Sequence, residues 1–169
     1  SYTTLSVTAI LGEVTTTQNG VTGEGDSIAT DVEGLVGGSA NDVLTGNISD
    51  NNLSGGAGND TLTGNPGQDV LNGDSGNDLL VGGGASDRLY GGVGIDTVTY
   101  ETHSTPVRAV LGDATSTGNG STSENDTIGS DNENLTGGSG NDSLLGNSAA
   151  NLINGGDGND QLAGGAADD

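Results

Sequence analysis

The sequence predicts an all-β protein in which very short strands stack in register as a parallel solenoid. The first observation is a nine-residue repeat that runs from Gly37 to Thr99 without an insertion or a deletion. The second is its constant content: glycine opens each cycle, the sixth place holds Asp or Asn, and the eighth place is aliphatic. The third is a further run in the same frame from Gly137. A fixed period of this kind is typical of architectures in which each repeat packs only on its neighbours.

Within a cycle, places one to six are expected to form a turn and places seven to nine a three-residue strand. Glycine readily adopts positive φ, and Asn and Asp tolerate it, which suits Gly-Gly-x-Gly-x-Asp to a turn. The middle side chain of such a strand points opposite to its neighbours. The eighth place therefore faces the interior, and the seventh and ninth places face water. The eighth-place residues are Leu44, Leu53, Leu62, Leu71, Leu80, Leu89 and Val98.

Two cycles are expected to make one coil with two parallel sheets, so turns on the same side lie 18 residues apart. The sixth-place side chains then form one column along each edge of the solenoid. One column holds Asp42, Asp60, Asp78 and Asp96, and the other holds Asn51, Asp69 and Asp87.

A longer repeat of 100 residues contains the shorter one. Residues 7–13 match residues 107–113, and Glu33 matches Glu133. Four segments follow: a leader with degenerate cycles at 1–36, an array at 37–99, a second leader at 100–136 and a second array at 137–169. We expect the leaders to continue the same solenoid with irregular turns. The repeats also favour the interpretation that this chain is a piece of a longer protein.

Composition argues against an ordinary globular core and for cations as partners. Hydrophobic residues make up 29% of the chain, and 24 acids against two bases give a formal charge of −22. Such values are typical of disorder, but a disordered segment has no need to keep phase over seven cycles. We therefore expect disorder without counter-ions and order with them. The acidic surface is expected to repel nucleic acid and anionic lipid, and no apolar run is long enough for membrane insertion.

The residues give no support for catalysis, and the chain is not expected to be an enzyme. Cysteine is absent, which excludes thiolate metal sites and disulfides. His103 is the single histidine, and we expect it to be solvated in a leader loop.

The cycle Gly-Gly-x-Gly-x-Asp-x-aliphatic-x resembles the RTX, or haemolysin-type, calcium-binding nonapeptide. Residues 55–63 and 137–145 match it at every place, and clear nonapeptides cover roughly 60% of the chain. The resemblance implies a right-handed parallel β-roll, in which each calcium ion lies between two successive same-side turns. Its ligands would be sixth-place carboxylates and backbone carbonyls. The ligand preference of calcium agrees, because it takes six to eight oxygens at about 2.3–2.6 Å, whereas Mg²⁺ demands a tighter octahedron.

Pairing turns 18 residues apart predicts roughly five to nine calcium sites. The stronger pairs are Asp42/Asp60, Asp60/Asp78, Asp78/Asp96, Asp69/Asp87 and Asp142/Asp160. The weaker pairs contain an amide or a longer acid, and are Glu33/Asn51, Asn51/Asp69, Glu133/Asn151 and Asn151/Asp169. The carbonyl ligands implied by the resemblance belong to Gly37, Gly38, Gly55, Gly56, Gly58, Gly73, Gly76, Gly82, Gly83, Gly91, Gly92, Gly94, Gly137, Gly138, Gly140, Gly155, Gly156 and Gly158.

The resemblance further implies a structural segment of a large secreted or cell-surface bacterial protein that folds on meeting calcium after type I export. A 100-residue unit in tandem builds length, which favours an adhesin or fibre-like parent, with end-to-end association between copies as a possible partner interaction. The alternative is an accessory region of a secreted enzyme or toxin whose catalytic domain lies outside this chain. Ice binding is disfavoured, because the third places carry no regular array of Thr and Asn.

Overall fold

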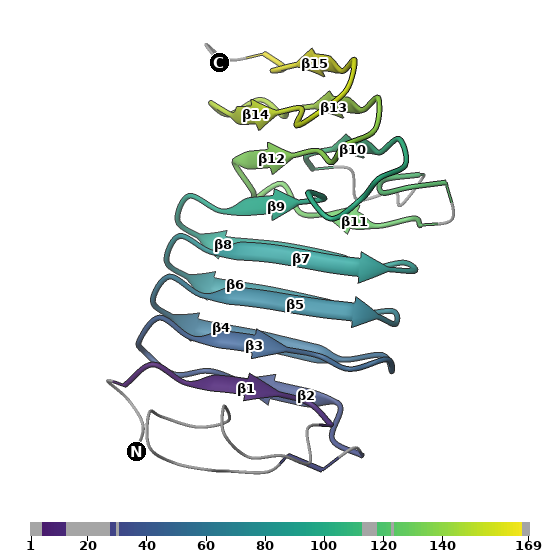
Figure 1. The fold of residues 1–169 in the computed structure, drawn as a ribbon. Coiled ribbons are helices and arrows are strands. Elements are labelled where there is room, and N and C mark those ends of the chain that lie inside the picture. The colour runs from purple at the N-terminus through teal and green to yellow at the C-terminus, as the bar shows by residue number, and fades with distance from the viewer. Residues whose placement is uncertain (1–4, 13–27, 30, 113–117, 123, 167–169) are drawn as a thin grey trace.

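The structure is a computed structural model that describes residues 5–12, 28–29, 31–112, 118–122 and 124–166. Its described part is all-β and forms a stack of parallel coils (Figure 1). The first nine strands are β1 (Thr8–Ile10), β2 (Gly34–Val36), β3 (Val43–Thr45), β4 (Asn52–Ala57), β5 (Thr61–Pro66), β6 (Val70–Ser75), β7 (Leu79–Gly84), β8 (Arg88–Val93) and β9 (Thr97–Thr99). The others are β10 (Arg108–Val110), β11 (Thr127–Ile128), β12 (Asn134–Thr136), β13 (Ser143–Leu145), β14 (Leu152–Asn154) and β15 (Gln161–Ala163).

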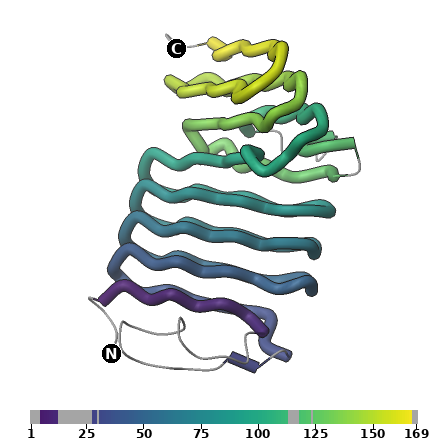
Figure 2. The backbone as a smooth tube through the Cα atoms, in the orientation of Figure 1, coloured from purple at the N-terminus to yellow at the C-terminus, as the bar shows by residue number. Residues whose placement is uncertain are grey.

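The chain passes alternately between two sides of the solenoid (Figure 2). One side is a seven-stranded sheet in the order β1-β3-β5-β7-β9-β12-β14. The other side holds a five-stranded sheet, β11-β8-β6-β4-β2, and a three-stranded sheet, β10-β13-β15. Every pairing between these strands is parallel. This confirms the expected β-roll fold class.

Neighbouring strands of one sheet, which we call rungs, pair residues that are 18 apart in the arrays, as the sequence predicts. Leu44 pairs with Leu62, which pairs with Leu80. These side chains and their counterparts on the other sheet are fully buried and make up a core one aliphatic residue wide per strand. The inward orientation of the eighth place is thereby confirmed.

The strands β4 to β8 are longer than expected. Each spans six residues rather than three, because pairing continues through places one to three of the following cycle. Gly56 pairs with Asp74 and Ala57 with Ser75, for example. The expectation that these places belong wholly to the turn was wrong: in the regular array, neighbouring rungs are close enough in shape to extend the ladder.

The leaders continue the solenoid, as expected, but with a longer step. The strand β1 pairs with β3 at an offset of 35 residues, and β10 pairs with β13 at the same offset. Between β10 and β11, Asn119 and Gly120 form an additional rung that runs antiparallel to its neighbours. The loop residues 13–27 of the first leader lie outside the described residues.

The two 100-residue units use opposite sides of the stack. The strands β1, β3 and β5 lie in the seven-stranded sheet, whereas their counterparts β10, β13 and β15 lie on the other side. The strands β2 and β4 exchange sides with β12 and β14 in the same way. A half-coil is one passage from one side of the stack to the other. Each unit therefore contains an odd number of half-coils, so the next unit begins on the opposite side.

Candidate metal centre

The sixth-place residues form the two expected columns, and a backbone hydrogen bond links each to the next. The N–H of one sixth-place residue donates to Oδ1 of the sixth-place side chain on the following rung, at 2.7–2.9 Å. The pairs joined in this way are Asp42/Asp60, Asp60/Asp78, Asp78/Asp96, Asn51/Asp69, Asp69/Asp87 and Asp142/Asp160. The structure thus brings together every stronger pair that the sequence predicts.

Five of these carboxylates keep one oxygen without a partner. Among the described residues, their Oδ2 atoms are buried and accept no hydrogen bond. We call the turns that carry them the open turns: 55–60, 64–69, 73–78, 82–87 and 91–96, with Asp60, Asp69, Asp78, Asp87 and Asp96. A buried carboxylate oxygen without a partner is costly, and calls for a cation or a proton.

Because the first-place glycine has no Cβ, space remains beside each such oxygen, and we call this space the glycine cradle. At Gly55, a Cβ would lie under 3.0 Å from both Asp60 Oδ2 and the carbonyl oxygen of Gly73 on the next rung. The same convergence of a carboxylate with a carbonyl recurs at Gly64 and at Gly73. Any other residue type in the first place would fill this space.

The open turns share one backbone conformation. Both the second and the fourth place have positive φ in all five of them. The second-place values are 103° at Gly56, 73° at Asn65, 74° at Asp74, 108° at Gly83 and 103° at Gly92. In these five turns, the described hydrogen bonds include none from a second-place N–H to the turn's own carboxylate.

Four other turns are closed by a hydrogen bond of their own. In the turn 37–42 the N–H of Gly38 donates to Asp42 Oδ2 at 2.5 Å, and in 137–142 the N–H of Gly138 donates to Asp142 Oδ2 at 2.7 Å. In 46–51 and 146–151 the N–H of the second-place Asn donates to the Oδ1 of Asn51 or Asn151, at 2.7 and 2.8 Å. In these closed turns a backbone amide occupies the oxygen that the open turns leave bare.

Asp160 differs from the open-turn aspartates in its exposure. Its Oδ1 accepts the Asp142 N–H at 2.9 Å, but its side chain is only half-buried, and its Oδ2 is not among the buried oxygens without a partner. The three atoms nearest to a Cβ at Gly155 would all belong to Asp160, as those at Gly82 and Gly91 belong to Asp87 and Asp96. The strand β15, directly after Asp160, has all three of its residues exposed.

Neither member of the pair Asp142/Asp160 is among the carboxylates with a buried oxygen that lacks a partner, and the pair stays a prediction as a calcium site. Asp142 lies in a closed turn, where an amide takes its Oδ2. Asp160 lies in a turn whose second and fourth places have the positive φ of the open turns, 85° at Gly156 and 125° at Gly158, but water reaches its carboxylate. In the described structure this pair lacks the desolvated oxygen that makes the open turns favourable for a cation.

Burial raises the pKa of the open-turn carboxyls. Desolvation is the largest cause, partly offset by the backbone N–H that each accepts, and neighbouring carboxylates raise the pKa further. The pKa of Asp60, Asp69 and Asp96 rises to about 6, that of Asp87 to about 8, and that of Asp78 is also raised. The open turns therefore resist negative charge until a cation compensates it.

The donor set fits calcium. It consists of oxygen atoms alone, from a carboxylate and a carbonyl on successive rungs, which hard divalent cations prefer. Among the described residues no group of three or more His, Asp or Glu side chains is placed to hold a metal, and the other oxygen donors beside Asp60, Asp69 and Asp78 are backbone carbonyls. Calcium, with its irregular geometry and high coordination number, tolerates such a site better than Mg²⁺ does.

Each column continues past the array onto a leader residue that the sequence analysis did not pair with it. The N–H of Asp87 donates to Oδ1 of Asp126 at 2.9 Å, and the N–H of Asp96 donates to Oε2 of Glu133 at 2.9 Å. Asp126 was missed altogether, although Asn-Asp-Thr-Ile at 125–128 repeats places five to eight of a cycle. That local pattern could have identified it.

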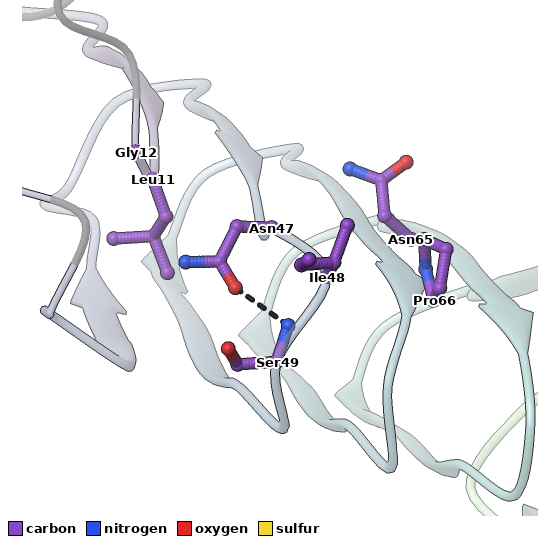
Figure 3. Close-up of a pocket in the computed structure, with 7 residues that line it drawn as sticks. All are labelled: Leu11, Gly12, Asn47, Ile48, Ser49, Asn65 and Pro66. Atoms are coloured by element: carbon purple, nitrogen blue, oxygen red, sulfur yellow. Dashed lines mark hydrogen bonds between the residues drawn. The ribbon is translucent and has the colours of Figure 1, made fainter.

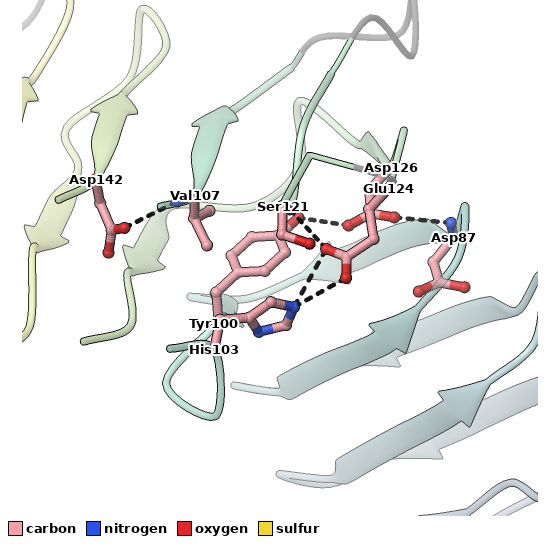
Figure 4. A network of polar contacts seen from close by, with 8 residues as sticks. All are labelled: Asp87, Tyr100, His103, Val107, Ser121, Glu124, Asp126 and Asp142. Atoms are coloured by element: carbon pink, nitrogen blue, oxygen red, sulfur yellow. Dashed lines mark hydrogen bonds and ion pairs between the residues drawn. The ribbon is translucent and has the colours of Figure 1, made fainter. Parts of the chain in front are cut away.

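A buried polar network surrounds Asp126 at the junction of the two units (Figure 4). The Tyr100 hydroxyl donates to Asp126 Oδ2 at 2.8 Å, so this carboxylate has a partner on the oxygen that open turns leave bare. His103 Nε2 lies 3.2 Å from both carboxylate oxygens of Glu124. The expectation of a solvated His103 was wrong, because its side chain is 12% exposed and packs edge-on against Tyr100.

The remaining predicted ligands occupy the expected turns. Asn151 Nδ2 donates to the Glu133 carbonyl, and the Asn52 N–H donates to that of Glu33, so the weaker pairs Glu133/Asn151 and Glu33/Asn51 lie on adjacent rungs. Asp169 lies outside the described residues. The carbonyls of Gly55, Gly73, Gly82, Gly91 and Gly155 face the first-place glycine of the preceding rung, and those of Gly38, Gly58, Gly76, Gly138 and Gly140 face a second- or fourth-place glycine of the next rung.

A pocket of about 590 Å³ lies beside the closed turn 46–51 and the first residues of the open turn 64–69 (Figure 3). Its wall contains Asn47, whose Oδ1 accepts the N–H of Ser49 at 2.8 Å. The other lining residues are Leu11, Gly12, Ile48, Asn65 and Pro66. No carboxylate lines it, which distinguishes it from the metal-binding edges.

Comparison with known families places these turns in context. The RTX calcium-binding nonapeptide repeat model matches the chain four times, at residues 35–62, 63–98, 127–162 and 136–169. No curated protein matches the sequence. None of the described residues forms a helix long and apolar enough to span a membrane. The matches cover more than half of the chain, and with its stacked turns, buried aspartates and glycine cradles it belongs to the RTX family, as a calcium-binding structural repeat segment.

Proposed function

We propose that this chain is a segment whose folding depends on calcium, with the open turns as its principal binding sites. The observation that carries the proposal is the set of five buried carboxylate oxygens without partners. Bound there, calcium would supply the positive charge that lets these carboxylates stay ionised inside the fold. Asp60, Asp69 and Asp78 would each hold it together with the carbonyl of the next first-place glycine.

Folding and binding are coupled in this proposal because the core is thin. One aliphatic side chain is buried per nine-residue cycle, and this falls short of the backbone entropy that ordering a cycle costs. The free energy of ion binding then becomes folding free energy. The closed turns, where an amide takes the place of the cation, need no ion in this scheme.

A calcium titration followed by circular dichroism tests the proposal. The chain is expected to be unfolded in EGTA, to gain β-structure as calcium rises, and to lose it again on chelation. Mg²⁺ at the same concentration should support much less structure. A chain equally structured in EGTA and in calcium would refute the coupling.

For the parent protein, we infer a large secreted or cell-surface bacterial protein in which such segments build length, as in an adhesin or fibre. The support is the 100-residue unit, which recurs in register and continues one solenoid across its junction. Type I export and the absence of catalysis in the segment belong to this inference. Mass determination of the native protein checks it: many tandem units support it, and an upstream catalytic domain with few units contradicts it.

A further inference from the structure

The chain shows one sheet edge twice, once with no partner strand among the described residues and once with a strand paired to it. Among the described residues, β2 pairs with β4 alone. Its counterpart 100 residues later, β12, pairs with β14 on one edge and with β9 on the other. The junction between the units is therefore a template for what the bare edge of β2 can accept.

Three kinds of contact hold β9 against β12. The strands pair in register, with Val98 opposite Leu135. The Asn134 N–H donates to the Asp96 carbonyl at 2.8 Å, and the Asp96 N–H donates to Glu133 Oε2 at 2.9 Å. Leu135 is fully buried by this arrangement.

The bare edge keeps the residues that make these contacts. Glu33 and Leu35 stand where Glu133 and Leu135 stand in the second unit. Glu33 is exposed, and Leu35 is only half-buried although it packs against the core. The backbone positions agree as well, because Leu35 pairs with Leu53 as Leu135 pairs with Ile153.

The departures affect side-chain bonds and leave the backbone contacts intact. Gly34 replaces Asn134, which removes the hydrogen bond from Asn134 Nδ2 to Thr97 Oγ1. Val36 replaces Thr136 and is 78% exposed. Since strand addition depends mainly on main-chain hydrogen bonds and on alternate side chains facing the core, neither change prevents it.

We propose that the edge formed by residues 33–36, the receiving edge, is a docking surface for another copy of the 100-residue unit. The strand of that copy equivalent to β9 adds to β2 in the register that β9 takes on β12. An exposed edge accepts extended strands in general. Here the choice of partner comes from Glu33, which needs the N–H of an Asp96-like residue, and from Leu35, which needs an aliphatic residue like Val98 beneath it. This inference goes beyond calcium-dependent folding, and requires only that the unit be folded.

Hydrogen exchange in an extended chain tests the proposal. A second copy of residues 1–100 is fused directly ahead of Ser1 of the full chain, which preserves the 100-residue phase. In saturating calcium, exchange of the Gly34 amide is expected to slow at least about tenfold relative to the unextended chain, since opening it then requires separating two units. The Asn134 amide serves as the internal reference and should not change. Equal exchange at Gly34 in the two proteins overturns the proposal.

Matched variants locate the effect. In the fusion, Leu35→Asp should restore fast exchange at Gly34, and the milder Glu33→Ala should restore part of it, whereas Val36→Asp on the outward face should leave the protection intact. If all three variants give the same exchange rate at Gly34, Glu33 and Leu35 do not select the docking strand. Circular dichroism of each protein in calcium and in EGTA separates the two proposals: protection at Gly34 without a calcium response refutes the proposed function alone, and a calcium response without protection refutes the docking alone.

Discussion

The turns 73–78 and 137–142 show that matching the motif and leaving a buried carboxylate oxygen without a partner are different properties. The turn 137–142 has Gly-Gly-Ser-Gly-Asn-Asp, a complete match, whereas 73–78 has Asp74 in the second place. Yet 137–142 is closed by the Gly138 N–H on Asp142, and 73–78 is open, with Asp78 Oδ2 buried and bare. The poorer match is the turn that keeps a buried carboxylate oxygen without a partner.

The difference comes from the rung beneath. Under 73–78 lies another nonapeptide turn, and Gly76 stacks on the carbonyl of Gly58. Under 137–142 lies the leader, where Gly138 faces the His103 carbonyl and the Ser139 N–H donates to it at 2.9 Å. A turn is held open by an equivalent turn below it, so open turns arise within an array and not at its first rung.

The largest expected effect separates the two kinds of turn by charge alone. Asp78→Asn keeps the oxygen that accepts the Asp60 N–H but removes the charge, and should cost about 2.7 kcal/mol when calcium is at about 100 times its Kd. Asp142→Asn, in a closed turn like that of Asn151, should leave the calcium midpoint unchanged. Calcium titrations of both variants by circular dichroism check this, and equal midpoint shifts would remove the distinction between open and closed turns.

A second pair of variants tests whether glycine holds the turns open. Gly76 has φ 138°, and a Cβ there would meet the backbone of Gly58, which cannot move aside. Gly76→Ala should destabilise the calcium-bound fold by about 2 kcal/mol. Gly84→Ala is the control, because nothing lies within 4 Å of its Cβ position. Urea unfolding in saturating calcium measures both, and a neutral Gly76→Ala would contradict the stacking argument.

The junction network should have a smaller effect. Tyr100→Phe removes the hydroxyl that donates to the buried Asp126 Oδ2, and leaves that oxygen as bare as those of the open turns. We expect a loss of about 1.5 kcal/mol, the value of a hydrogen bond to a charged group, together with a rise in the pKa of Asp126 from its value of about 6. Unfolding measured at pH 5 and pH 8 checks this: the loss should be larger at pH 8, and a loss independent of pH would rule out the role of Asp126.

The smallest effect concerns competition between protons and calcium. Burial raises the folded-state pKa of Asp60, Asp69 and Asp96 from 3.8 to about 6. Their contribution to the cation-free fold is therefore fully present below about pH 4 and is lost as pH rises through about 6. Calcium binds the ionised form, so the half-saturating calcium concentration should be about tenfold higher at pH 5 than at pH 7. Titration at both pH values measures it, and a lower midpoint at pH 5 would reverse the sign.

Sequence period was sufficient for the fold and for the membership of each column, because a constant phase leaves little choice of register. The inward leucines and the stacking of Asp60 on Asp42 follow directly from it.

The state of each turn could not be predicted, because it depends on the neighbouring rungs. Gly138 and Gly56 are both second-place glycines, but the rungs beneath their turns differ, and so does the state of the two turns. Asp160 has the same place in the cycle as Asp78 but lies beside an exposed strand, so its carboxylate differs in exposure from that of Asp78. The partners of Asp87 and Asp96 were missed because leaders of irregular length break the 18-residue step.

The exchange of sides between the units has a consequence for the form of a long array. At the junction, Asn119 and Gly120 add a rung on one side of the stack, whereas β9 and β12 are direct neighbours on the other side. Such a wedge would tilt the axis toward the side with fewer rungs. Because the next unit begins on the opposite side, its junction would tilt the axis back. Successive tilts would then cancel, and many units in tandem would form a straight rod with a shallow zigzag. With an even number of half-coils per unit, the tilts would add and the array would curve into an arc.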